Sequence, residues 1–196
     1  ALLHEHGLSR SGPVDPRSAD AFPLVVKDSA GTSSRGVWLV RTRAELDAAL
    51  REAERTPLKG DLIAEPYFTG PLYSAETVTW AGRTRLLGVL SRQLSPEPVR
   101  REEAAAFPVA FPAADLAELG RWIERVPAVA GHDRGFAHTE FVLTADGPEV
   151  VNARIGGALV GEALCRSLGT NVYDAMVSMA LAAEPALLTE PLKPGT

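Results

Sequence analysis

Short apolar runs dominate the first half of the chain and return near residue 140. Runs of this length, rich in Val and Leu and bounded by Gly, Pro and Asp, are typical of β-strands. Two of the gaps between runs, Ala81-Gly82 and Ala145-Asp146-Gly147, are turn sequences that favour hairpins. The predicted strands are residues 22–27, 37–40, 61–64, 73–80, 83–90, 136–143 and 149–153.

Three segments instead repeat apolar residues with the helical period. The clearest follows Thr42-Arg43-Ala44-Glu45, a capping box that predicts the start of a helix. Residues 91–115 hold four prolines and are predicted to be mainly connection. Because strands and helices do not alternate regularly, the pattern favours an α+β fold over a doubly wound parallel sheet. The apolar helix positions are Leu46, Ala49, Leu50 and Ala53; Leu116, Leu119, Ile123 and Val126; and, after the cap Asn171, Val172, Ala175, Met176 and Met179.

Composition narrows the class of protein. The 196 residues, 45% hydrophobic and 23% charged, suit one globular domain or two small joined subdomains. A net charge of −5 with no basic run argues against nucleic acid or an anionic membrane as a partner. No apolar stretch has the length of a membrane helix. A single cysteine, Cys165, excludes an internal disulfide framework and a Cys-based zinc site. Because proteins without disulfides are typical of reducing compartments, we expect a cytoplasmic protein.

Lys27 ends an apolar strand directly before a segment of small and polar residues, 28–36. Loop N–H groups and an ammonium group are complementary to phosphate oxygens, so this pair predicts a phosphate-binding site. The segment lacks the Gly-Lys-Ser/Thr ending of a Walker A loop. The alternative is a lysine that only marks the exposed end of its strand.

The hairpin around residues 145–147 carries His138 and Glu140 on one strand and Asn152 and Arg154 on the other. Side chains alternate along a strand, so each pair shares a face. A two-residue turn sends Asn152 away from Glu140, whereas a three-residue turn sets Glu140 opposite Asn152 and His138 opposite Arg154. The second register gathers oxygen ligands for Mg²⁺ beside an anion-binding Arg. The alternative is a solvated sheet face with a surface ion pair.

These features occur together in the ATP-grasp superfamily. FPLVVKDSAGTSSRGVWLV resembles its nucleotide-binding hairpin, LIAEPYFTGPLYSAE its linker and ribose-side strand, and GFAHTEFVLTADGPEVVNARIGG its metal-binding hairpin. The chain looks most like carboxylate–amine ligases that make dipeptides or siderophore-type amides, and biotin-carboxylase-like enzymes are related. The resemblance implies an α+β ATP-grasp fold, whose two subdomains grip the nucleotide with mainly antiparallel sheets. The implied parts are a lead-in segment 1–19, a small subdomain 20–66 and a large subdomain 67–196.

The resemblance also implies roles for individual residues. Lys27 would contact the α-phosphate of ATP, and residues 31–36 would close over the β- and γ-phosphates. Glu140 and Asn152 would bind Mg²⁺, while Arg154 would hold the acyl phosphate or the substrate carboxylate. The residues expected around the nucleotide are Lys27, Gly31, Ser33, Ser34 and Arg35, then Glu65, Pro66, Tyr67 and Phe68 at the adenine edge, and Glu76 and His138.

The sequence departs from the family pattern at several positions. Val150 stands where a second acidic metal ligand is usual, and alternation predicts that the neighbouring Glu149 points away. Leu72 and Ala64 stand where many relatives carry Glu. Enzymes of this family have a preceding N-terminal domain, and the chain begins without Met. We therefore expect it to be the ATP-binding part of a longer enzyme, with the missing domain supplied in cis.

The expected function is ATP- and Mg²⁺-dependent ligation of a small-molecule carboxylate to an amine through an acyl phosphate. One alternative is a degenerate ATP-grasp module that binds nucleotide without turnover, which Val150 favours. Another is a non-catalytic scaffold domain. Nucleotide binding would separate the scaffold from the other two.

Overall fold

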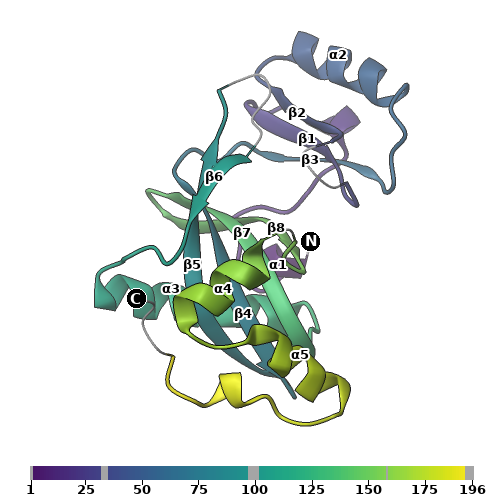
Figure 1. The fold of residues 1–196 in the computed structure, drawn as a ribbon. Helices are drawn as coiled ribbons and strands as arrows, with labels where there is room; N and C mark the ends of the chain where they lie inside the picture. Colours follow the sequence, from purple (N-terminus) through teal and green to yellow (C-terminus); the bar gives the residue numbers. More distant parts are fainter. Residues whose placement is uncertain (1, 32–34, 97–101, 158, 193–196) are drawn as a thin grey trace.

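The computed structural model describes residues 2–31, 35–96, 102–157 and 159–192, and its strands form two sheets (Figure 1). The smaller sheet has the order β2-β1-β3 and the larger has the order β6-β5-β4-β7-β8. All the strand pairs in these sheets are antiparallel, which confirms the predicted α+β class. The strands are β1 (Leu24–Asp28), β2 (Val37–Val40), β3 (Leu62–Pro66), β4 (Leu72–Trp80), β5 (Arg83–Leu94), β6 (Glu102–Ala106), β7 (Arg134–Thr144) and β8 (Gly147–Arg154).

Helix α2 (Arg43–Ala53) packs on one face of the three-stranded sheet. Thr42 caps it, because its Oγ1 accepts a hydrogen bond from the Glu45 N–H at 3.2 Å. The Glu45 carboxylate accepts in return from the Arg41 N–H at 2.6 Å, one residue earlier than in the usual capping box. The predicted helix start is confirmed. The core beneath the helix consists of Ala19, Leu24, Val26, Val40, Leu46, Ala49 and Ala64.

Helices cover both faces of the five-stranded sheet, and each face has its own core (Figure 1). On one face α3 (Ala113–Val129) packs with the short N-terminal helix α1 (Leu2–Glu5) nearby. On the other lie α4 (Val160–Leu168), α5 (Val172–Ala180) and the 3₁₀ helix η2 (Ala186–Leu188). The α3-side core comprises Leu8, Ala75, Val89, Leu119, Ile123, Val126 and Phe141, and the α5-side core comprises Val78, Leu87, Leu164, Leu168, Val172, Ala175, Met179, Leu187 and Leu188.

The remaining elements show where the sequence pattern succeeded and where it failed. The helices α2, α3 and α5 were predicted, whereas α4 was not. Residues 91–115 are not mainly connection, because β5 continues to Leu94 and β6 pairs with it. All five side chains of β6 are exposed, so this edge strand has no apolar alternation to reveal it. A second 3₁₀ helix, η1 (Pro16–Ser18), lies in the lead-in segment.

Within the described residues, no helix combines the length and the apolar character needed to cross a membrane. The predicted subdomain boundaries after residues 19 and 66 stay predictions. The three-stranded sheet uses residues 24–66 and the five-stranded sheet uses residues 72–154.

Candidate active site

A β-bulge sets the register of the hairpin that carries most of the candidate residues. Thr144 pairs with Gly147, so the turn has two residues, Ala145 and Asp146, and the three-residue alternative is excluded. The register shifts between Glu140 and Phe141, where Val151 is the extra residue of β8. Beyond the bulge, the predicted pairs of Glu140 with Asn152 and of His138 with Arg154 are confirmed, although the bulge and not the turn produces them.

The same bulge changes which way Glu149 points. Glu149 is the acidic neighbour of Val150, which stands where a second acidic metal ligand is usual in the family. Val150 pairs with Phe141 and packs against the α3-side core. Glu149 pairs with Val142, which shares a face with Glu140 because it lies two residues further along β7. Glu149 therefore lies on the face of the candidate site, and the prediction that it points away is wrong.

Glu149 is nevertheless held by the lead-in segment. Its side chain is 2% exposed and accepts hydrogen bonds from the Ser9 hydroxyl at 2.8 Å and the Arg10 backbone N–H at 3.2 Å. The Arg10 guanidinium also pairs with Glu149 and with Asp146 in the hairpin turn. The same guanidinium lies 5.7 Å from the ring centre of Phe68. Arg10 thus joins the lead-in segment, the linker after β3 and the hairpin, a role that no pattern around it in the sequence indicates.

His138 lies at the centre of a buried charge cluster on the large sheet. Its ring is 0% exposed, with Nδ1 2.5 Å from a Glu76 carboxylate oxygen and Nε2 3.2 Å from Glu140 Oε1. Both nitrogens can donate to these carboxylates only when the ring is the imidazolium cation. Burial lowers the pKa of His138, but the hydrogen bonds and charges of Glu140 and Glu76 outweigh it and raise the pKa above 6.5. The cluster therefore favours the charged ring.

Glu140 accepts hydrogen bonds from four side chains. Besides His138, the donors are Arg92 Nη2 at 3.3 Å, Asn152 Nδ2 at 3.3 Å and Arg154 Nη2 at 3.4 Å. Burial raises the pKa of Glu140, but the His138 hydrogen bond, the Arg92 charge and the Asn152 amide lower it to about 2. The carboxylate is consequently anionic at neutral pH, which is the form in which a carboxyl group binds a cation.

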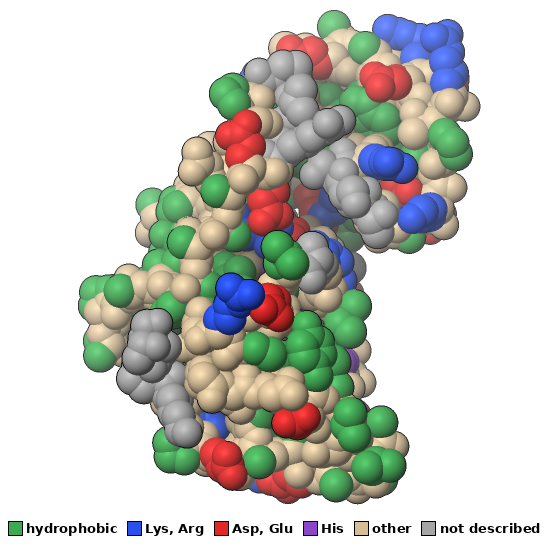
Figure 2. Space-filling view, in the orientation of Figure 1, with side chains coloured by type: hydrophobic (Ala, Val, Ile, Leu, Met, Phe, Trp, Pro, Cys, Tyr) green, Lys and Arg blue, Asp and Glu red, His purple; other side chains and the backbone are tan. Residues whose placement is uncertain are grey.

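Lys27 reaches this hairpin from the small sheet. Leu24 and Val26 point into the core under α2, so alternation places Lys27 on the opposite face of β1. Its Nζ donates to the Val151 carbonyl at 2.9 Å and pairs with Glu65 at 2.5 Å. Figure 2 shows acidic and basic side chains gathered at the junction between the two sheets. The structure therefore brings Lys27 and Glu65 beside the bulge of the β7–β8 hairpin.

Asp28 joins the start of the segment that follows Lys27 to the turn before β3. Its carboxylate accepts from the backbone N–H groups of Ala30 at 3.0 Å, Lys59 at 2.8 Å and Gly60 at 2.9 Å. The Lys59 bond, followed by those of Ala30 and Gly60, outweighs burial and lowers the pKa of Asp28. Gly31 N–H donates to the Asp28 carbonyl at 3.0 Å. This anchoring carboxylate was not singled out in the sequence.

The other predicted nucleotide residues are less closely grouped. Pro66 ends β3 opposite Leu24, and the Tyr67 N–H donates to the Pro23 carbonyl at 3.0 Å. Arg35 is exposed and lies in the segment 28–36. Ser33 and Ser34 lie outside the described residues. The assignment of all these residues to a nucleotide stays a prediction.

Glu140 and Asn152 are the candidate Mg²⁺ ligands of the β7–β8 hairpin. Among the residues that the structure describes, no group of three or more His, Cys, Asp and Glu side chains is arranged to hold a metal. Glu140 and Asn152 are cross-strand neighbours that together offer an anionic and a neutral oxygen donor. Mg²⁺ is commonly held by one or two protein oxygens and completes its shell with phosphate and water. The pair therefore fits Mg²⁺ carried by a nucleotide better than Mg²⁺ alone.

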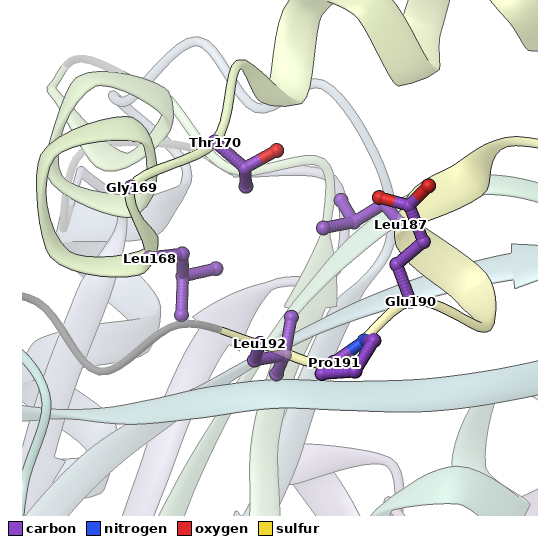
Figure 3. A pocket seen from close by; sticks show the side chains of 7 residues that line it. All are labelled: Leu168, Gly169, Thr170, Leu187, Glu190, Pro191 and Leu192. Carbon is purple, nitrogen blue, oxygen red and sulfur yellow. The ribbon is translucent and has the colours of Figure 1, made fainter.

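A pocket at the far end of the large sheet is lined by other residues (Figure 3). It lies between the end of α4, around Leu168, and the segment 187–192. Three leucines and one proline line it, and Glu190 is its one acidic side chain. None of its residues belongs to the cluster around His138.

The sequence of the chain matches a known domain family. Residues 20–162 match the model of the ATP-grasp domain, so the chain belongs to the ATP-grasp family. The ATP-grasp resemblance predicted from the sequence is confirmed, both for the family and for the fold. No curated protein sequence matches.

Solved structures give the same fold. An L-amino acid ligase from Bacillus licheniformis superposes with a TM-score of 0.81 and 25% identity, over 98% of this chain and 49% of that one. The D-alanine–D-alanine ligase from Coxiella burnetii gives 0.71 and 17% over 92% and 54%. The biotin carboxylase domain of Hydrogenobacter thermophilus 2-oxoglutarate carboxylase, solved with MgADP and bicarbonate, gives 0.69 and 17% over 84% and 37%. The chain thus spans 37% to 54% of these three proteins.

Proposed function

We propose that the chain is the ATP-binding part of a ligase that joins a small-molecule carboxylate to an amine, using ATP and Mg²⁺ and passing through an acyl phosphate. The observation that supports this most is the contact of Lys27 with the Val151 carbonyl. It sets the cation of the small sheet beside the strand that carries Asn152 and Arg154. In this reaction the carboxylate takes the γ-phosphoryl group of ATP, and the amine then displaces phosphate.

Phosphoryl transfer depends mainly on cations placed against the charge of the phosphate oxygens. Lys27 and Arg154 each donate to a backbone carbonyl, those of Val151 and Ile155, at 2.9 and 3.0 Å. Phosphate oxygens are stronger acceptors than neutral carbonyls, so nucleotide would replace these contacts. Glu140 and Asn152 would hold Mg²⁺, which would supply positive charge against the phosphate oxygens.

The substrates proposed are amino acids. The L-amino acid ligase of Bacillus licheniformis, matched over 98% of this chain, supports an amino acid as the source of the carboxylate. The amine would come from a second small molecule. A cytoplasmic location and the absence of nucleic-acid and membrane partners are part of the same proposal.

Calorimetry with a non-hydrolysable ATP analogue and Mg²⁺ tests this function. Lys27→Ala should weaken analogue binding by about tenfold or more, because a charge-assisted contact is lost. Arg51→Ala removes an exposed cation from the outer side of α2 and serves as the control, with unchanged affinity expected. Equal affinities in the parent and Lys27→Ala would remove Lys27 from the site. If the parent does not bind the analogue, both nucleotide-binding functions are excluded and only the non-catalytic scaffold domain is left.

A degenerate module that binds nucleotide without turnover is the second candidate. It is favoured by Val150, because the family usually has an acidic metal ligand at this position. The Val150 side chain instead packs against the α3-side core. ADP release by the full-length protein, on addition of L-amino acids, separates the two candidates. Nucleotide binding without ADP release under any amino-acid pair would select the degenerate module.

A further inference from the structure

Arg92 is a buried cation of β5 with no role so far in the proposed reaction. Its side chain is only 8% exposed. Nη2 pairs with Glu102 and lies 3.3 Å from Glu140, and Nη1 lies 3.3 Å from His138 Nε2. Nε is buried and has no hydrogen-bond partner among the described residues. A buried N–H without an acceptor is costly, so the site is one acceptor short.

Ser74 presents a second unpaired group on the same face. It is 0% exposed, and its hydroxyl also has no partner within the described part of the chain. Ser74 lies between Glu140 on β7 and Leu90 on β5, and Leu72 is the cross-strand partner of Arg92. Ser74 and Arg92 are therefore diagonal neighbours, with Cα atoms about 7–8 Å apart and within reach of one small ligand.

Glu102 indicates what kind of ligand this is. It comes from the edge strand β6, its side chain is 40% exposed, and its carboxylate binds Arg92 Nη2. Guanidinium groups bind carboxylates through two adjacent N–H groups, and Nε is the neighbour of one Nη. Glu102 thus binds Arg92 Nη2 while Arg92 Nε stays unpaired. An incoming carboxylate could bind both of these nitrogens.

We propose that Arg92 and Ser74 bind the carboxylate of the substrate, and that Glu102 occupies the guanidinium until the substrate replaces it. This deepens the proposed ligase function and rests on it. The carboxylate accepts from Arg92 Nε and Nη2 and from the Ser74 hydroxyl. A phosphate oxygen has the same acceptor chemistry, but Lys27 and Arg154 are already placed for phosphate. Arg92 Nε and the Ser74 hydroxyl are buried in the free protein, so a side chain must move before a ligand can reach them. Glu102 is that side chain, because it is half-exposed and binds Arg92.

Saturation-transfer NMR with a panel of L-amino acids and their matched amides tests this site, with and without the ATP analogue and Mg²⁺. The full chain should bind at least one amino acid and not its amide, which lacks the carboxylate. Arg92→Met should weaken that binding by about tenfold or more, and Ser74→Ala by a smaller factor. Glu102→Gln should tighten it, because a competing carboxylate is gone. Glu103→Gln, an exposed neighbour on β6, should leave it unchanged.

The direction of the Glu102→Gln effect separates binding from architecture. If the ion pair with Arg92 is only structural, Glu102→Gln weakens amino-acid binding as Arg92→Met does, and the proposal is wrong. Loss of analogue affinity in Arg92→Met with unchanged amino-acid affinity would assign Arg92 to phosphate instead. If Arg92→Met does not fold, as circular dichroism would show, Ser74→Ala and Glu102→Gln still decide. Analogue binding without amino-acid binding overturns this inference alone, whereas absent analogue binding overturns the proposed function.

Discussion

Replacing Glu140 by Gln removes the one carboxylate that four side chains of the cluster share. The pKa of Glu140 falls from the usual 4.5 to about 2 in the folded protein. Its side chain is 17% exposed, so solvent screens these contacts only in part. A difference of this size corresponds to on the order of 3 kcal/mol of folding free energy at neutral pH.

The sign of this contribution follows from the direction of the pKa change. Because folding lowers the pKa of Glu140, its contribution is complete above about pH 4.5 and is lost as the pH falls toward 2. The pKa of His138 is raised instead, so its contribution is complete below 6.5 and is lost as the pH rises through its folded value. The cluster therefore stabilises the fold most between these two limits.

Urea unfolding followed by tryptophan fluorescence, over a series of pH values, measures the difference between the parent and Glu140→Gln. We expect the parent to be more stable at neutral pH by a few kcal/mol, and the gap to shrink steadily between about pH 5 and pH 2. Glu118→Gln makes the same exchange at an exposed position of α3 and controls for the loss of one charge. A gap that stays constant over this acid range would refute the reasoning, because the folded carboxylate would then not be held ionised by its neighbours.

Other perturbations probe the hairpin and the linker that packs on it. Gly70→Ala should cost about 1–3 kcal/mol or more and weaken analogue binding, because φ is +149° and a Cβ would overlap the Leu143 carbonyl oxygen. Thermal unfolding and calorimetry on the same sample would show whether the two effects occur together. Val150→Glu should lower stability by roughly 1–3 kcal/mol in urea unfolding, because position 150 faces the α3-side core. For the same reason it should not tighten Mg²⁺-dependent binding of the analogue. Tighter binding at full stability would mean that β8 is not bulged. Phe141→Ala should cost about 3–5 kcal/mol in the same assay, since the ring is 0% exposed, and a loss below 1 kcal/mol would mean that the core relaxes around the cavity.

Several features of the site follow from local sequence alone. The alternation of Leu24, Val25, Val26 and Lys27 is enough to place the lysine on the face opposite the core, because a strand has a period of two. Thr42 starts α2 because its hydroxyl oxygen accepts a hydrogen bond from the Glu45 N–H in the first turn. The order of the three motifs likewise indicates the ATP-grasp family from the sequence alone.

Other features depend on partners far away in the chain. Two residues of turn would have put Asn152 on the wrong face, and the bulge at Val151 restores it. The sequence around Val151 carries no sign of a bulge. The bulge sets Glu149 where Ser9 and Arg10 bind it, more than 130 residues earlier, and Val151 where Lys27 meets its carbonyl.

The pairing of Arg92 with Glu102 was hidden for a related reason. An exposed edge strand has no buried face, so its pattern resembled connection and its charged residues were given no role. The sequence by itself determined the family, every described strand except β6 and the side of β1 on which Lys27 stands, because these rest on periodicities and motifs within a few residues. Only the tertiary structure decided which charges meet around Glu140, because strand register and bulges depend on the free energy of contacts between distant segments.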